Sequence, residues 1–294
     1  MTPGPTALHF SEATSHDMFA QRLPHSKDDS LPQILAAAVT HLHALIRELR
    51  PTQADWRKAI EFLTDVGHAS DERRQEWVLL SDLLGVSALV EEINSRRPKA
   101  ATPNTVRGPF FRADVPQLAL GSNISLDGIG ETVDVSGRVQ DLDGDPIANA
   151  EIITWQANAQ GFYENQQPDL QPEFNLRGSF RTDTDGHFHY RTIKPCGYGV
   201  PDDGPVGKLL RQAGYPLRRP AHLHFIIKAP GFETITTHIY DSSDPHLAED
   251  AIFSVKPDLV RSFERQGERQ GKCATTWRLD LAFVMVRARQ GADT

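Results

Sequence analysis

The sequence has few cysteines, no long apolar run and no excess of positive charge. Its two cysteines, Cys196 and Cys273, do not form a CxxC spacing, which favours a reducing compartment and excludes a zinc ribbon. No stretch approaches about eighteen consecutive apolar residues and no apolar segment follows Met1, so we expect neither a membrane span nor a secretion signal. The net charge of -8 disfavours a nucleic-acid partner. These absences predict a cytoplasmic protein without a nucleic-acid or membrane partner.

The composition that remains is that of an ordinary globular protein. Hydrophobic residues make up 39% of the 294 residues and charged residues 24%, values typical of chains that bury a core of their own. The patterns along the chain divide it into a tail over residues 1–30, a helical region over 31–100 and a β-rich region over 101–290. We therefore predict a mainly β fold, a β-sandwich catalytic domain preceded by a helical linker or dimerisation domain.

Three helices are predicted in the helical region. Apolar residues recur at steps of three and four over residues 34–49, which indicates one amphipathic helix. Thr52 and Asp55 form a capping-box-like start for a second helix over 52–67, and a third is expected over 71–93. Isolated amphipathic helices are marginal in water, so these helices must pack on a domain or on a partner subunit.

Alternating residues and turn signals predict hairpins in the β-rich region. Residues 133–139 alternate, a turn of Asp, Gly and Pro follows, and residues 152–155 form the expected return strand. A second hairpin is predicted between residues 180–182 and 187–193. Spacing of this kind is typical of an all-β sandwich.

Two later strands are predicted in and after the segment that contains the candidate metal ligands. They are expected over 222–228 and 234–240, with a Pro-Gly turn between them. Before them, residues 195–214 are rich in Gly and Pro and read as a long loop, irregular over most of its length. Long loops in compact domains are often functional.

His222 and His224 are the sharpest local feature. On a strand their imidazoles point to one face, whereas Leu223 and Phe225 point to the other, so both rings can reach one metal ion. Histidines satisfied at a sheet surface are the alternative interpretation. Arg219, just upstream, would suit an anionic substrate or intermediate.

Two of the five tyrosines lie in loops that could aim a side chain at such a site: Tyr163, after Gly161, and Tyr198, between two glycines. Two phenolates with two imidazoles favour ferric iron over zinc or copper, because phenolate is a hard anionic oxygen donor. Tyr190 is expected in the core. Spacing alone does not rank Tyr198 above Tyr215.

Several motifs in the same order resemble the intradiol ring-cleavage dioxygenase family. They are residues 105–111 (TVRGPFF), 161–163 (GFY), 197–205 (GYGVPDDGP), 219–225 (RPAHLHF), 236–238 (TTH) and 250–253 (DAIF). The helical region is also similar to the helical linker domain of the catechol and hydroxyquinol 1,2-dioxygenase branch. The resemblance covers roughly residues 31–285.

The resemblance implies one Fe(III) per subunit, held by Tyr163, Tyr198, His222 and His224. It ranks Tyr198 above Tyr215, makes Tyr198 the ligand that leaves and accepts a proton as substrate arrives, and puts Arg219 against the substrate ring. The implied substrate-binding residues are Leu79, Asp82, Val106, Gly108, Pro109, Phe110, Val200, Pro201, Arg219, His238 and Phe253. For Leu79, plain core packing is an equal alternative. A homodimer through the N-terminal helices, with a lipid between them, is implied as well.

Within the family, His238 and Asp82 favour hydroxyquinol as substrate. The catechol-specific branch is expected to have glutamine at the position of His238, and a site built for a third hydroxyl discriminates well against diols that lack it. The expected product is 3-hydroxy-cis,cis-muconate, the enol of maleylacetate. Alternatives are a catechol or chlorocatechol 1,2-dioxygenase, a non-catalytic β-sandwich binding module, and an extradiol or cupin-type ferrous oxygenase.

Overall fold

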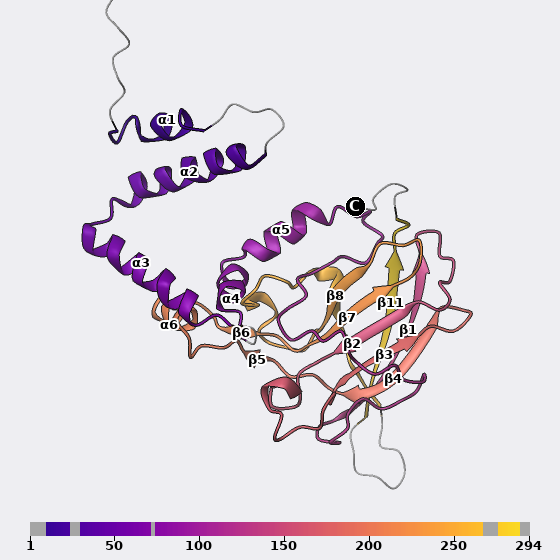
Figure 1. Ribbon diagram of the computed structural model, residues 1–294. Coiled ribbons are helices and arrows are strands. Elements are labelled where there is room, and N and C mark those ends of the chain that lie inside the picture. Colours follow the sequence, from indigo (N-terminus) through magenta and orange to yellow (C-terminus); the bar gives the residue numbers. More distant parts are fainter. Residues whose placement is uncertain (1–9, 24–29, 72–73, 267–275, 289–294) are drawn as a thin grey trace, which may run out of the picture. The chain divides into compact units, whose positions relative to one another are not determined.

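The computed structural model describes residues 10–23, 30–71, 74–266 and 276–288 (Figure 1). The chain forms two compact units, Met1–Asp65 and Val66–Thr294. Helices come first and β-strands dominate after them, which confirms the predicted fold class. The helices are α1 (Ser15–Ala20), α2 (Ser30–Leu49), α3 (Gln53–His68), α4 (Glu76–Leu83), α5 (Val86–Asn94) and α6 (Pro205–Gln212). No helix among the described residues has the length and apolar character that crossing a bilayer requires.

The first two predicted helices form as expected, as α2 and α3. The start of α3 carries the capping box: the backbone N–H of Asp55 donates to the Thr52 hydroxyl at 3.2 Å, and that of Thr52 donates to the Asp55 carboxylate at 3.1 Å. The predicted tail differs, because Ser15–Ala20 within it forms the short helix α1. Residues 1–9 and 24–29 of the tail lie outside the described residues.

The third predicted helix is wrong as one continuous element. It is split into α4 and α5 at Gly85, which has a φ of 71°. That left-handed backbone ends the helical hydrogen-bond ladder and suits glycine. Asp71 itself precedes α4 and is not helical.

Two sheets make the β-sandwich of the second unit. One has the order β3 (Arg177–Arg181), β2 (Glu151–Trp155), β7 (His222–Lys228), β8 (Ile235–Asp241) and β9 (Val260–Arg261). The other has the order β10 (Glu264–Gln266), β11 (Thr276–Met285), β1 (Thr132–Asp141) and β4 (His187–Ile193). A small ladder joins β5 (Tyr198–Gly199) to β6 (Arg218–Arg219). Single turns of 3₁₀-helix lie at Glu164–Gln166, Leu247–Glu249 and Pro257–Leu259.

Both early hairpin predictions are wrong, although the strands exist. β1 pairs with β4 and β11, and β2 pairs with β3 and β7, so the turn after β1 carries the chain from one sheet to the other. The turn between β3 and β4 does the same in reverse. Each strand thereby places one face on the shared core. The hairpin of β7 and β8 is confirmed.

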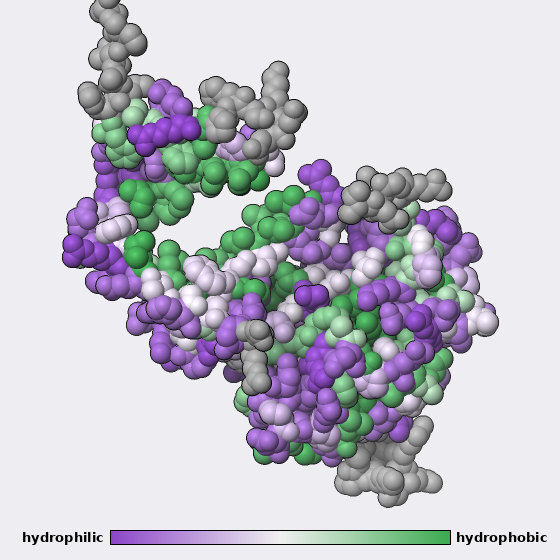
Figure 2. All heavy atoms as spheres, viewed as in Figure 1, coloured by the Kyte–Doolittle hydropathy of each residue, from purple (hydrophilic) through white to green (hydrophobic). Residues whose placement is uncertain are grey.

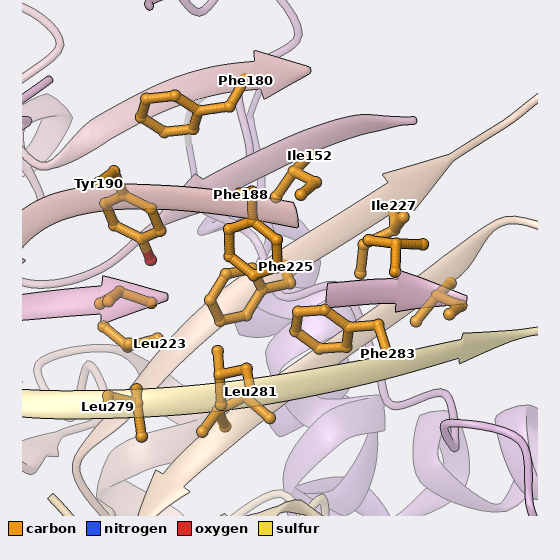
Figure 3. Close-up of a cluster of buried hydrophobic side chains, with 14 of the residues drawn as sticks. Ile152, Phe180, Phe188, Tyr190, Leu223, Phe225, Ile227, Leu279, Leu281 and Phe283 are labelled. Carbon is orange, nitrogen blue, oxygen red and sulfur yellow. The ribbon is translucent and has the colours of Figure 1, made fainter. Parts of the chain in front are cut away.

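The core lies between the two sheets. Phe180 and Phe225 from one sheet meet Phe188 and Phe283 from the other, and all four are buried (Figure 3). Burying large apolar side chains of this kind contributes about 1.5–3 kcal/mol each. The core thus fixes which face of β7 is free to carry polar side chains.

The segment 195–214 also departs from the prediction of an irregular loop. Its second half contains α6, which begins with Pro205 at its first turn, where a missing N–H is harmless. The backbone N–H of Val206 donates to Glu76 at 3.1 Å. This contact ties α6 to the start of α4.

Candidate active site

The site is built on the face of β7 that points away from the core. Leu223 and Phe225 belong to the sandwich core, so the alternation of the strand turns His222 and His224 to the other face, as predicted. The β7–β8 register sets His238 directly opposite His224. Three buried histidines therefore share one patch of the sheet, with a ring nitrogen of each within 4.8 Å of the others.

Four donor atoms converge on this patch. The Tyr163 hydroxyl lies 2.9 Å from Nε2 of His224 and 3.1 Å from the Tyr198 hydroxyl. Nε2 of His222 lies 3.2 Å from Nε2 of His224. Two phenol oxygens and two imidazole nitrogens from three separate chain segments thus face one another.

Local backbone features bring the two tyrosines in. Gly161, with a φ of 88°, turns the chain so that Tyr163 begins the 3₁₀ turn. Tyr198 pairs with Arg219 across the β5–β6 ladder, so one strand pair supplies both a phenol and the guanidinium. The Tyr163 ring stacks on Phe110 with ring centroids 4.3 Å apart.

Burial dominates the electrostatics of the site. Burial lowers the pKa of His222 to about 3, with Arg219 acting in the same direction, and burial also holds the pKa of His224 well below its usual value. Both rings are therefore neutral, which is the form that binds metals. Burial, and then Tyr198, raises the pKa of Tyr163 well above its usual value. A Tyr163 phenolate at neutral pH thus requires a cation at the site.

The donor set fits a hard metal ion. Paired phenol oxygens and neutral imidazoles suit a trivalent ion such as ferric iron. His238 has other partners on both ring nitrogens: its Nδ1 lies 2.5 Å from the Thr105 hydroxyl, and its Nε2 lies 3.5 Å from Nη2 of Arg219. Arg219 approaches His222 as well, with Nη1 3.2 Å from its Nε2. The tyrosines are what favour His222 and His224, because the Tyr163 hydroxyl lies 2.9 Å from Nε2 of His224, and that atom lies 3.2 Å from Nε2 of His222.

A cavity of about 370 Å³ opens beside these donors. The predicted residues that line it are Leu79, Asp82, Pro109, Phe110, Tyr198, Val200, Pro201 and Arg219. The lining residues that sequence reasoning did not assign are Asp71, Arg74, Gln75, Glu76, Val78, Gln166, Asp203 and Ile252. Asp203 and Ile252 lie inside two motifs that carry the family resemblance, so the sequence could have indicated these two residues as part of the site.

Other predicted residues lie elsewhere. Val106 and Phe253 line a separate cavity of about 170 Å³, and Phe253 is 55% exposed. Gly108 lies next to His224: a Cβ on it would meet Cε1 of that ring at 3.5 Å. His238 is fully buried in the histidine patch and is not among the lining residues of the larger cavity.

Two buried neighbours of the ligand candidates had no sequence signal. Trp155 stacks on His224 with centroids 4.5 Å apart, because β2 pairs with β7 at that position. Arg177, also buried, donates to Glu164 at 2.6 Å and to the Phe110 carbonyl at 2.6 Å, behind the Tyr163 ring. Only strand pairing brings these residues to the site.

The remaining tyrosine candidates are accounted for by their partners. Tyr190 lies in the core, as expected, with its hydroxyl 3.2 Å from that of Thr154. The Tyr215 hydroxyl donates to the Ala251 carbonyl at 3.1 Å. Neither hydroxyl joins the four converging donors.

Comparison with known proteins defines the family. Residues 106–283 match the family model described as dioxygenase, and residues 28–102 match the model described as catechol dioxygenase N terminus. The chain belongs to the intradiol ring-cleavage dioxygenase family, whose members are non-haem iron oxidoreductases. It is an enzyme of that class, which sets aside a non-catalytic binding module.

Within the family, the chain falls in the hydroxyquinol branch. It is 47% identical to a hydroxyquinol 1,2-dioxygenase of Rhizobium sp., over 95% of this chain and 97% of the relative. It is 43% identical to a 6-chlorohydroxyquinol 1,2-dioxygenase of Cupriavidus pinatubonensis, over 90% and 93%. The crystal structure of hydroxyquinol 1,2-dioxygenase from Pseudomonas putida superposes with a TM-score of 0.88 at 39% identity, covering 94% of this chain and 99% of that one.

Proposed function

We propose that this enzyme cleaves hydroxyquinol, benzene-1,2,4-triol, between its two adjacent hydroxylated carbons, using O₂ and one ferric ion per chain. The proposed ligands are Tyr163, Tyr198, His222 and His224. The convergence of their four donor atoms within hydrogen-bond distance carries the proposal. The names of the relatives in the hydroxyquinol branch support the choice of substrate.

The location of each residue determines its proposed role in the reaction. When bound, ferric iron supplies the Lewis acidity that favours deprotonation of the diol and of the phenols. Tyr198 lines the cavity, and its phenolate would accept a proton from the arriving diol and become a phenol, whereas buried Tyr163 stays in place. Arg219 lines the same cavity and stabilises negative charge that develops on the ring. Both atoms of O₂ end in the ring-opened dicarboxylate, so no external reductant is needed.

Asp82 is the favoured partner for the third hydroxyl. Its side chain lines the cavity on α4, and burial raises the pKa of its carboxyl. Catechol has no third hydroxyl to meet this carboxyl, so it would bury Asp82 further with only the hydrogen bond from Ser87 to offset the loss of water. His238 is not among the residues that line the cavity, and its ring nitrogens lie next to Thr105 and Arg219. Its influence on the choice of substrate is therefore indirect, through those two residues.

The substrate is tested by steady-state kinetics on hydroxyquinol, catechol and chlorocatechols with iron-quantified protein. We expect the highest kcat/KM for hydroxyquinol, with 3-hydroxy-cis,cis-muconate as product. Asp82→Ala should lower the ratio of kcat/KM for hydroxyquinol to kcat/KM for catechol by about 10-fold or more. This is the scale of a lost hydrogen bond to a charged group. A wild-type preference for catechol or a chlorocatechol would overturn the proposed substrate and leave the family intact.

The ligand set is tested by colour and metal content. Tyrosinate bound to iron(III) gives a broad visible charge-transfer band, so Tyr198→Phe should weaken that band and abolish turnover. Tyr190→Phe is the matched control, because it removes a buried phenol hydroxyl whose partner is Thr154. Colourless wild-type protein with full iron occupancy would refute the tyrosine ligands.

We also propose a homodimer through the N-terminal helices. The stripe predicted on α2 leaves Ile34, Leu42, Leu45 and Leu49 each about half exposed, and Figure 2 shows hydrophobic side chains gathered along α2. Such a surface favours an apolar partner. Light scattering should give twice the chain mass, and extraction with organic solvent followed by mass spectrometry reveals whether a lipid accompanies the dimer. A monomer at micromolar concentration contradicts the interface.

A further inference from the structure

The turn Asp250–Ser254, which follows the second 3₁₀ helix, holds the guanidinium of Arg219 through two side chains, those of Asp250 and Ser254. We propose that Asp250 and Ser254 are positioning residues that fix the direction in which this guanidinium meets the substrate. The inference rests on the proposed function, because it assigns Arg219 to the substrate ring. It adds residues that touch neither the ligand candidates' donor atoms nor the larger cavity.

Three of the contacts of Arg219 come from this turn and from β8. Its Nε donates to Oδ1 of Asp250 at 3.1 Å, and its Nη2 donates to the Ser254 hydroxyl at 2.9 Å. Nη2 also donates to the Tyr240 hydroxyl at 3.2 Å. Two edges of the planar guanidinium are thereby fixed, and Nη1 is turned toward Nε2 of His222 at 3.2 Å.

The turn is itself rigidly built. Oδ2 of Asp250 accepts hydrogen bonds from the backbone N–H of Ser254 at 3.0 Å and from its hydroxyl at 2.8 Å. Phe253 between them adopts a φ of 58°, a left-handed conformation that is costly for a side chain of this size. The backbone N–H of Ala251 donates to the Arg218 carbonyl at 2.9 Å, which joins the turn to β6. A strained conformation that persists is held by its surroundings, and the hydrogen bonds of Ala251 and Ser254 fix the backbone on both sides of Phe253.

Burial explains why the anchor matters. Arg219 is 3% exposed and Asp250 7%, and a buried cation needs a partner. Asp82 is a carboxylate on the cavity that Arg219 lines. Without Asp250, the flexible arginine would be drawn toward Asp82 and away from the ring it has to meet. Loss of direction, with the charge of Arg219 retained, is therefore the expected consequence of removing the anchor.

The first variant is Asp250→Asn, and its matched control is Asp141→Asn. Asp141 is also buried, also ion-paired to an arginine, Arg287 at 2.7 Å, and also accepts backbone N–H groups in a turn. We expect Asp250→Asn to lower kcat on hydroxyquinol by about 10- to 100-fold, the scale of a misplacement near 1 Å, with KM within about threefold. Iron content and the visible band should stay as in wild type. Asp141→Asn should keep kcat within about twofold even where its Tm falls.

A double-mutant cycle separates positioning from general support. In an Arg219→Lys background, which cannot make the same fork of hydrogen bonds, Asp250→Asn should change kcat by less than about twofold. If Asp250→Asn does not fold, Ser254 carries the test: Ser254→Ala should lower kcat, and Ser254→Thr, which keeps the hydroxyl, should restore it. Equal factors for Asp250→Asn in both backgrounds, or a wild-type kcat in Asp250→Asn or Ser254→Ala, overturn the inference.

The failure of the proposed function is distinguishable from the failure of this inference. Wild-type protein that is full of iron but turns over no diol refutes the function before any variant is compared. Active wild-type protein with an unaffected Asp250→Asn variant refutes only the role of the turn.

Discussion

Gly161 offers a sharp test of how the backbone positions Tyr198. Its φ is 88°, and a Cβ added to it would stand 2.6 Å from Cβ of Tyr198. Ordinary van der Waals contact begins at 3.4 Å, so Gly161→Ala requires a shift of 3.4 − 2.6 = 0.8 Å. Tyr198 cannot relieve the contact by rotating its ring, because the clash is with the first atom of its side chain and its Cα is only 3.5 Å away. The ligand candidate itself must move.

The expected effect of Gly161→Ala is a loss of catalysis larger than its loss of stability. Alanine in a left-handed conformation costs about 1 kcal/mol, whereas moving a reacting group by nearly 1 Å costs about 100-fold in rate. Gly144→Ala is the matched control, because Gly144 has a φ of 87° and nothing within 4 Å of the added Cβ. It should share the backbone strain and keep full activity.

The assay compares kcat, iron content and the position of the visible band in the two alanine variants and the wild type. Gly161→Ala should lower kcat by about 100-fold and shift or weaken the band. Gly144→Ala should show only the stability loss that the shared backbone strain causes. If the two variants lose activity equally, or if Gly161→Ala retains a wild-type band and kcat, the close approach to Tyr198 does not position it.

Three further predictions concern stability. Glu164→Gln should destabilise the protein by about 3–5 kcal/mol in urea, because it leaves the buried cation of Arg177 without its carboxylate. Arg177→Met should cost clearly less stability, because Glu164 keeps its ion pair with Arg112 at 3.2 Å. A larger loss of stability in Arg177→Met than in Glu164→Gln would refute this account. Removing iron with a chelator should lower Tm, since an ion bound only by the folded state stabilises it by about 2.7 kcal/mol at 100 times its Kd; an unchanged Tm after verified iron loss argues against a buried site. Thr52→Ala should weaken the start of α3 by about 1 kcal/mol, seen as faster hydrogen exchange of its first amides; unchanged exchange means that the capping box contributes nothing.

The local patterns of the sequence predicted much of the fold. Helical periodicity and a capping pair placed α2 and α3, and the alternation of β7 placed His222 and His224 on one face. These features depend on residues within a few positions of each other, so the chain's own geometry determines them. The motifs quoted for the family resemblance also contained eight of the residues that line the larger cavity, Tyr198, Arg219 and Ile252 among them.

Strand pairing and sheet membership were decided only by the tertiary structure. The strands at 133–139 and 152–155 looked like a hairpin, yet they belong to different sheets, because a sandwich buries one face of each strand on a common core. The same pairing brings Trp155 and His238 to His224. A backbone hydrogen bond from Ala251 to the Arg218 carbonyl, between segments far apart in the sequence, sets Asp250 against Arg219. A one-dimensional pattern records which face of a strand is apolar; it does not record which distant strand will cover that face.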